Sequence, residues 1–221
     1  LNGWHLEKLD GSDYQTNSQA LAQKIDQLTR KPFDLSKDYM LRASLIHLAA
    51  EDHILVVTIH HIASDGWSIS VMVRELVEHY SAYQQKRASR LPKLDIQYAD
   101  YALWQRKYLQ GEILDSKLNY WKEKLQDVTP LELPTDYSRP AIAGNNGAVI
   151  EFKIDKEQSN QLQQLSQNNQ VTLFMTLLSA IKVLLYRYSG QQDICVGSPI
   201  ASRQQHEVEG LIGFFLNTLA L

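Results

Sequence analysis

The chain has 221 residues, 44% of them hydrophobic and 21% charged, a composition typical of a folded globular protein rather than a disordered one. Its net charge is −3 and its 22 basic residues form no long run, so neither nucleic acid nor an anionic membrane is expected as a partner. No signal peptide opens the chain, and no apolar run reaches ~18 residues without a charge, which predicts no membrane span.

A single cysteine, Cys195, excludes an internal disulfide and fits a reducing, cytoplasmic location. Cys195 stands in a short apolar run that reads as a strand, so we expect a small buried core residue rather than a nucleophile. The chain begins with Leu1 and stops at Leu221, inside an apolar run. Because termini usually lie at the surface, we expect an internal piece of a longer domain, cut at both ends.

The first part of the chain predicts mixed strands and helices. Apolar residues at helical spacing behind a serine cap predict a helix over 18–30, in which Leu21, Ile25 and Leu28 form the apolar face. Further elements are expected in this order: strands over 40–48 and 53–60 joined as a hairpin, a helix from near Ser68 to about Lys86, and helices over 97–110 and 113–126 with aromatic stripes.

Residues 128–147 are rich in proline and glycine and have few periodic apolar residues, which predicts a linker. The elements expected after it are a half-buried strand over 148–154, a short polar helix around Leu162 and Leu165, a buried apolar helix from a Thr172 cap to Gly190, and strands over 193–200 and 211–221. This order indicates a layered α/β or α+β fold, divided into residues 1–127 and 128–221.

The sharpest local feature is His60-His61-x-x-x-Asp65-Gly66, placed between a predicted strand that ends at His61 and a predicted helix. Aspartate and glycine both suit the tight turn expected there. Successive strand side chains point to opposite faces, so His60 should pack away from His61. His61, at the strand end, could act as a general base. Asp65 could orient the loop, with Arg42 of the neighbouring strand as its candidate partner.

Three other interpretations compete. The two histidines could be ordinary core residues, although the Asp-Gly turn weakens that interpretation. His60, His61 and Asp65 could bind a metal, but opposed histidine faces make joint ligation awkward. Ser64 or Ser68 could belong to a serine triad, but no Gly-x-Ser-x-Gly occurs and Ser68 is better explained as a helix cap. The residues alone therefore predict a candidate His-dependent enzyme and nothing finer.

A known family shares these patterns. Residues 60–68, His-His-Ile-Ala-Ser-Asp-Gly-Trp-Ser, resemble the active-site motif of condensation domains from nonribosomal peptide synthetases. Residues 98–105, Tyr-Ala-Asp-Tyr-Ala-Leu-Trp-Gln, and 212–219, Ile-Gly-Phe-Phe-Leu-Asn-Thr-Leu, are similar to two later motifs of that family. Pro32-Phe-Asp-Leu35 and Leu41-Arg42 stand at a family-like distance before the histidines. Three motifs in order, spanning most of the chain, make the resemblance specific.

The resemblance implies a two-lobed fold like that of chloramphenicol acetyltransferase, here truncated at both ends, with a tunnel between the lobes. It implies peptide-bond formation between substrates held on the phosphopantetheine arms of partner carrier domains, beside an adenylation domain, with no cofactor bound directly. His61 would then position or deprotonate the amine, or stabilise the tetrahedral intermediate. The site roles implied for other residues are structural for His60 and Asp65, close backbone approach for Gly66, and tunnel or substrate contact for Trp67, Ser68 and Asn217.

Several departures from the family pattern matter. The motifs before the Leu6 region and after Asn217 are absent, Tyr39 stands where a proline is common, and the arginine that pairs with Asp65 could lie in an absent strand. We therefore expect the 221 residues to be inactive alone. The histidines argue against heterocyclisation domains, and Gly-Trp-Ser after Asp65 argues against epimerisation domains, which favours an L-configured donor. A non-catalytic carrier-docking domain of the same fold and a coenzyme A-dependent acyltransferase remain as alternatives.

Overall fold

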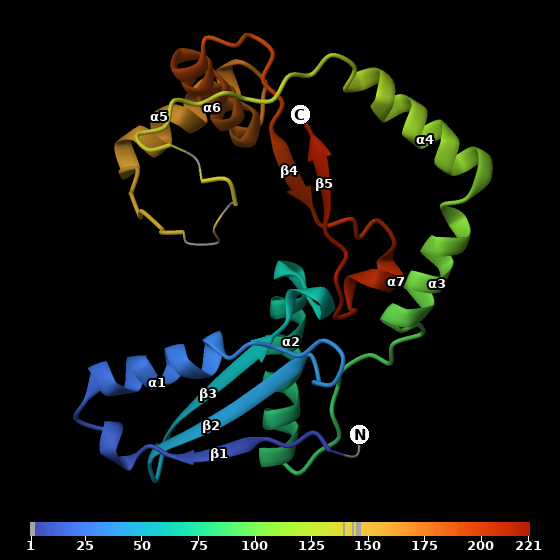
Figure 1. Ribbon diagram of the computed structural model, residues 1–221. Helices are drawn as coiled ribbons and strands as arrows, with labels where there is room; N and C mark the ends of the chain where they lie inside the picture. The colour runs from blue at the N-terminus through green and yellow to red at the C-terminus, as the bar shows by residue number, and fades with distance from the viewer. Residues whose placement is uncertain (1–2, 139, 143, 145–146) are drawn as a thin grey trace. The chain divides into compact units, whose positions relative to one another are not determined.

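A computed structural model of the chain describes residues 3–138, 140–142, 144 and 147–221 (Figure 1). The chain divides into two compact units. The first runs to Ile113 and takes up Pro199–Thr218 again, and the second comprises Leu114–Ser198 and Leu219–Leu221. The boundary expected between residues 127 and 128 therefore lies inside the second unit. Helices and strands are mixed, as the α/β prediction states.

A three-stranded sheet with the order β1-β2-β3 forms the body of the first unit. β2 (Leu41–Ala49) and β3 (Asp52–Ile59) pair antiparallel, with Leu41 opposite Ile59, which confirms the predicted hairpin. β1 (Glu7–Asp10) lies parallel to β2 and was not predicted. Its four residues, Glu-Lys-Leu-Asp, are mostly polar because it forms an exposed edge, so the alternation that marks a half-buried strand is missing.

α1 (Ser18–Arg30) follows a 3₁₀ turn at Ser12–Tyr14 and lies along the sheet in Figure 1. The predicted face, Leu21, Ile25 and Leu28, packs against a core of three sheet residues, Ile46, Leu48 and Val56. The predicted cap is wrong by one residue. Asn17, not Ser18, caps the helix, because its side-chain oxygen accepts a hydrogen bond from the Ala20 N–H at 3.0 Å.

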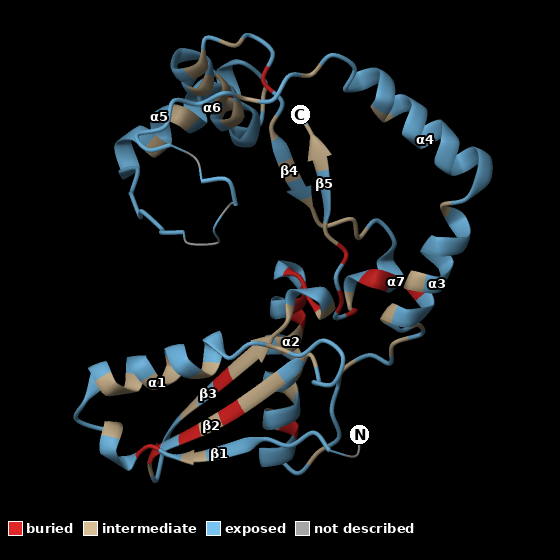
Figure 2. Ribbon diagram, viewed as in Figure 1, coloured by how far each residue is buried: buried red, intermediate tan, exposed pale blue. Residues whose placement is uncertain are grey.

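A second core of the first unit forms around Pro199–Thr218, the later segment that belongs to this unit. α3 (Tyr98–Tyr108) and α4 (Gly111–Lys124) confirm the two predicted aromatic helices. Tyr101 of α3 packs with residues of α7 (His206–Glu209) and the segment after it, namely Val208, Leu211 and Phe215. Figure 2 shows that buried residues concentrate in the sheet, at the start of α2 (Gly66–Gln84) and around α7. These are the elements that position the site.

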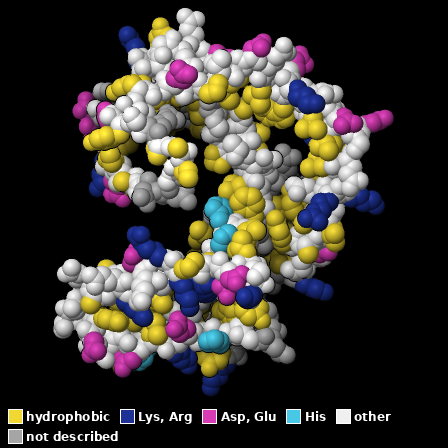
Figure 3. Space-filling model, in the orientation of Figure 1, with side chains coloured by type: hydrophobic (Ala, Val, Ile, Leu, Met, Phe, Trp, Pro, Cys, Tyr) yellow, Lys and Arg dark blue, Asp and Glu magenta, His cyan; other side chains and the backbone are white. Residues whose placement is uncertain are grey.

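In the second unit, α5 (Lys156–Asn168) packs against α6 (Leu173–Ser189). The caps predicted for α6 are confirmed, since Thr172 accepts from the Met175 N–H and Gly190 ends the helix at φ 71°. Its predicted burial is wrong: none of its residues is buried. α5 packs against this helix, yet Phe174, Val183 and Leu184 remain 54–59% exposed, and hydrophobic side chains lie at the surface over the helix pair (Figure 3).

Two strand predictions in the later chain also need correction. Residues 148–154 form no strand, and Val149, Ile150 and Phe152 are 82–88% exposed, because no strand in the described part of the chain pairs with them. The strands predicted over 193–200 and 211–221 shorten to β4 (Gly197–Ile200) and β5 (Asn217–Ala220), which pair with each other.

Cys195 is exposed rather than buried, because it precedes β4 while its neighbour Ile194 takes the buried position. Among the described residues, no single helix is long and apolar enough to span a membrane. α5 and α6, bent by 103° at the break between them, pass that test of length and composition only when they are counted together.

Candidate active site

The turn that carries the histidines is built by local hydrogen bonds. β3 ends at Ile59, two residues before the predicted end at His61, and His61–Ala63 form a 3₁₀ turn. α2 then begins at Gly66, with Asp65 as its N-cap. The Asp65 carboxylate accepts from the Ser68 N–H at 2.9 Å, and the Asp65 N–H donates to the Ser68 hydroxyl at 3.4 Å. Ser68 is therefore the third helical residue of a capping box, not the cap itself.

The two histidines have different surroundings, although neither lies in a strand: His60 precedes the 3₁₀ turn and His61 begins it. The His60 Nδ1 accepts from the Ile62 N–H at 3.0 Å, and the His60 ring meets the Phe33 ring edge-on at 5.6 Å between centroids. The His61 Nδ1 lies 2.7 Å from the Ser64 carbonyl oxygen, and the His61 ring meets the Phe214 ring edge-on at 5.3 Å. The His60 side chain thus stabilises the turn, whereas the His61 side chain remains exposed.

The Ser64 contact determines which nitrogen of a neutral His61 ring carries the proton. A carbonyl oxygen only accepts hydrogen bonds, so Nδ1 must carry the proton that joins them. In the neutral ring this leaves the lone pair on Nε2, which is the nitrogen available to take a proton. The exposed His61 side chain can therefore act as a general base through Nε2.

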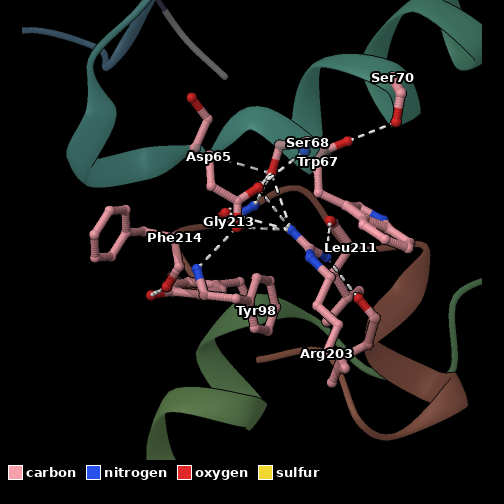
Figure 4. Close-up of polar contacts among 12 residues, drawn as sticks. Asp65, Trp67, Ser68, Ser70, Tyr98, Arg203, Leu211, Gly213 and Phe214 are labelled. Atoms are coloured by element: carbon pink, nitrogen blue, oxygen red, sulfur yellow. Dashed lines mark hydrogen bonds and ion pairs between the residues drawn. The ribbon is translucent and has the colours of Figure 1, made fainter. Parts of the chain in front are cut away.

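Beneath this turn lies a buried ion pair between Asp65 and Arg203, whose side chains are 0% and 1% exposed (Figure 4). The Arg203 Nη2 donates to the two carboxylate oxygens at 3.1 and 3.3 Å. The carboxylate also accepts from the Ser68 hydroxyl at 2.7 Å and from the Phe215 N–H at 3.1 Å. Donors from Ser68, Arg203 and Phe215 thus surround the carboxylate, and Asp65 links the start of α2 to residues 203–215.

These donors also set the ionisation of Asp65. Burial alone raises the pKa of its carboxyl, but the hydrogen bonds from Ser68 and Phe215 and the charge of Arg203 outweigh burial. The net pKa of Asp65 lies below its ordinary value of 3.8, so the ion pair is intact near neutral pH.

Arg203 ties the ion pair to the returning chain. Its Nη1 donates to the Val208 and Leu211 carbonyls, each at 2.7 Å, and its guanidinium lies 3.9 Å from the centre of the Phe215 ring. Among the described residues, the Arg203 Nε is the one buried side-chain polar atom that finds no hydrogen-bond partner. A charge held this way fixes residues 203–215 against the start of α2.

The predicted partner of Asp65, Arg42, is wrong. Arg42 turns toward the loop after α1, where it pairs with Asp38 at 2.6 Å and donates to the Lys31 and Pro32 carbonyls. Its guanidinium also lies over the Phe33 ring at 3.8 Å. Sequence reasoning missed Arg203 because it lies 138 residues from Asp65 and no local pattern marks it.

The other predicted site residues differ in how far their side chains are exposed to solvent. Ser68 is 1% exposed and its hydroxyl bonds Asp65 and Gly213, so it has no freedom to contact a substrate or act as a nucleophile. Trp67 is 46% exposed, and its indole N–H donates to the Glu209 carbonyl at 2.9 Å. Asn217 begins β5, where its side chain accepts from the Thr218 N–H. A Cβ at Gly66 would meet nothing within 4 Å.

All three sequence motifs meet at this place. The Tyr98 hydroxyl donates to the Phe214 carbonyl at 2.8 Å, and the Tyr98 ring packs so closely on Gly213 that a Cβ there would lie 2.2 Å from it. The Ser68 hydroxyl oxygen accepts from the Gly213 N–H at 3.1 Å and lies 2.9 Å from the Gly213 carbonyl oxygen. These contacts hold residues 213–215 in a loop, which explains why the strand predicted over 211–221 begins only at Asn217.

Asp65 does not serve as a ligand in the metal site considered above, because its carboxylate accepts hydrogen bonds from Arg203 and from the Phe215 N–H. A search of the described side chains for three or more grouped His, Cys, Asp or Glu ligands finds no such cluster.

Solved structures share this fold over almost the whole chain. The X-domain from teicoplanin biosynthesis matches with a TM-score of 0.85 at 25% identity, covering 98% of this chain and 48% of that one. Holo-AB3403, a four-domain nonribosomal peptide synthetase, matches with a TM-score of 0.80 at 25% identity, covering 99% of this chain and 16% of that one. Fold and histidine turn together define a domain of the chloramphenicol acetyltransferase-like class, as predicted.

Sequence comparison narrows this class to a family. The family model described as "Condensation domain" matches residues 3–221. Two of the component chains of linear gramicidin synthase from Brevibacillus parabrevis are similar to this chain. One is 51% identical over 191 residues, 86% of this chain, and the other is 46% identical over 217 residues, 98% of this chain. The chain therefore belongs to the condensation-domain family of nonribosomal peptide synthetases. It spans 4% of the length of each of these two relatives.

Proposed function

We propose that this chain supplies the catalytic histidine of a domain that joins two carrier-bound substrates through an amide bond. The observation that carries the proposal is the His61 ring, exposed and held by the Ser64 carbonyl so that Nε2 is the free base. A base at this position can take the proton that an acceptor amine loses as its nitrogen bonds to the carbonyl carbon.

In the proposed reaction, the nitrogen of the acceptor amine attacks the carbonyl carbon of the donor thioester. The His61 Nε2 takes the proton that the amine loses as the C–N bond forms. The tetrahedral intermediate then breaks its C–S bond, and the protonated His61 returns the proton to the departing sulfur. The products are an amide on the acceptor carrier and a free thiol on the donor carrier, and His61 ends as it began.

The surroundings of His61 support this division of roles. The buried ion pair of Asp65 with Arg203 fixes the start of α2 and takes no part in proton transfer. Gly66, beside it, is exposed and borders open space, which leaves room for a substrate to approach the turn. The buried ion pair thus holds the turn in place, and the open space beside Gly66 gives an attacking group access to it.

We further propose the partners of the reaction. The two substrates arrive on phosphopantetheine arms of upstream and downstream carrier domains, beside an adenylation domain, and the chain binds no cofactor of its own. The donor is L-configured, for which Gly66-Trp67-Ser68 after Asp65 is the supporting pattern. The 221 residues alone are inactive, because the matched X-domain chain is about twice as long as the part that this chain covers.

The test is a condensation assay with the natural protein that carries this chain, given donor and acceptor carriers loaded with aminoacyl phosphopantetheine. Dipeptide on the acceptor carrier, formed faster from an L-donor than from its D-enantiomer, supports the proposal. Turnover of free acyl-coenzyme A without carriers would instead indicate the coenzyme A-dependent alternative. Binding of carriers without product would indicate a docking domain. An arm with the isolated 221 residues should give no product, and product at the full rate would contradict that part.

A further inference from the structure

We propose that Tyr98 is a positioning residue for His61 and that it acts through Phe214. The inference deepens the proposed function and rests on it, because it concerns how the imidazole is held for proton transfer. The residues involved come from three separate parts of the chain: the histidine turn, the first residue of α3 and the loop before β5.

The His61 ring needs a second constraint besides the Ser64 hydrogen bond. One hydrogen bond to Nδ1 fixes the tautomer but allows the ring to swing about the bonded nitrogen. The Phe214 ring supplies that constraint, because it meets the imidazole at 5.3 Å with an angle of 79° between the ring planes. An edge-to-face contact of this kind has a preferred geometry, so the direction of Nε2 depends on where the Phe214 ring stands.

Phe214 lies in a loop, and side chains rather than a sheet ladder fix its backbone. The Ser68 hydroxyl accepts from the Gly213 N–H, and Asp65 accepts from the Phe215 N–H. The Phe214 carbonyl between them is bonded by the Tyr98 hydroxyl at 2.8 Å (Figure 4). The peptide that follows Phe214 is therefore held at both of its polar groups, the N–H by Asp65 and the carbonyl by the Tyr98 hydroxyl.

The fit of Tyr98 to this loop is close. Its ring occupies the space that any side chain at position 213 would need, since a Cβ there would lie 2.2 Å from the ring, and it meets the Phe215 ring edge-on at 5.2 Å. Removing the hydroxyl alone leaves these ring contacts in place. Tyr98→Phe thus isolates the one hydrogen bond that holds the Phe214 carbonyl.

The natural full-length protein with Tyr98→Phe should form the amide about tenfold more slowly at saturating carriers, since small misplacements of a reacting group cost rate steeply. KM for the carriers should change less than about twofold, because Tyr98 itself contacts no substrate in this scheme. The matched control is Tyr101→Phe. Tyr101 lies on the same helix and packs on the same Phe215 ring, but its hydroxyl bonds Gln105. Tyr101→Phe should keep the wild-type kcat.

Two backgrounds show whether Tyr98 acts through the proposed route. Phe214→Leu should also lower kcat, and adding Tyr98→Phe to it should produce no further loss, because coupled residues are not additive. In a His61→Ala background, Tyr98→Phe should change nothing. Phe214→Tyr, which keeps the ring edge, should restore most of the rate lost in Phe214→Leu.

The outcomes separate the two claims. If His61→Ala is slow but Tyr98→Phe matches the wild type, the positioning role fails and the proposed function stands. If Tyr98→Phe slows a His61→Ala enzyme as much as the wild type, Tyr98 does not act through His61 and the inference is overturned. If His61→Ala itself reacts at the wild-type rate, both claims fail.

Discussion

Replacing Asp65 by asparagine tests the buried ion pair, which holds the start of α2 to residues 203–215. The change keeps the shape of the side chain but removes its charge. It leaves the guanidinium of Arg203 buried, and it turns one acceptor oxygen into an N–H₂ group that faces donors such as the Phe215 N–H. The Asp65 side chain is 0% exposed, so water cannot replace the lost contacts.

The size of the loss follows from burial. Removing one partner of a buried ion pair typically costs ~3–5 kcal/mol. Arg203 keeps its bonds to the Val208 and Leu211 carbonyls, which places our expectation at the lower end, about 3 kcal/mol of unfolding free energy. The matched control is Asp38→Asn, since Asp38 pairs with Arg42 at 2.6 Å but the two side chains are 38% and 24% exposed. That control should cost far less, because solvent screens an exposed pair.

Urea unfolding of the wild type and the two variants, followed by circular dichroism, measures these losses. Adding Arg203→Met to Asp65→Asn should recover part of the lost stability, because it removes the unpaired buried charge. If Asp65→Asn were no less stable than Asp38→Asn, the buried pair would not hold this part of the fold, and our assignment of a structural role to Asp65 would be refuted.

Two further predictions concern stability. The Arg87 guanidinium and the Arg90 N–H lower the pKa of Glu78 from 4.5 to about 2, so Glu78 contributes its full stability above pH 4.5 and loses it as the pH falls toward 2. Unfolding free energy measured over that range should fall less steeply in Glu78→Gln, and equal slopes would contradict the assignment. Gly213→Ala should lose ~1–3 kcal/mol because its Cβ would strike the Tyr98 ring at 2.2 Å, whereas Gly66→Ala, with open space around it, should lose nothing. Equal melting temperatures for the two glycine variants would show that the contact with Tyr98 is looser than the structure has it.

Features with a local cause could be predicted from the sequence. The apolar spacing of α1, the β2–β3 hairpin and the caps of α6 each depend on residues a few positions apart, and the structure confirms them. Strand alternation predicted that His60 and His61 diverge, but both follow the end of β3 at Ile59, and the 3₁₀ turn at His61–Ala63 gives them their different neighbours.

Features decided by distant chain could not be predicted this way. The partner of Asp65 is 138 residues away, and Arg42 was only the arginine nearest in the predicted hairpin. The apolar pattern of α6 and of residues 148–154 shows that these segments could be buried, but burial also requires another element to pack against them. Among the described residues, too few side chains pack against these two segments to bury them. The role of Tyr98 is visible only once the loop before β5 is folded against α3.

The most direct test of the central claim is the single-turnover rate of amide formation in the natural protein with His61→Ala. A general base typically contributes ~10²–10⁴-fold, so the variant should be slower by that factor while it still binds loaded carriers. His206→Ala is the control, because the His206 side chain is 93% exposed and pairs with Glu209 of the same helix, and it should react at the wild-type rate. A His61→Ala protein that forms the amide as fast as the wild type would contradict the account.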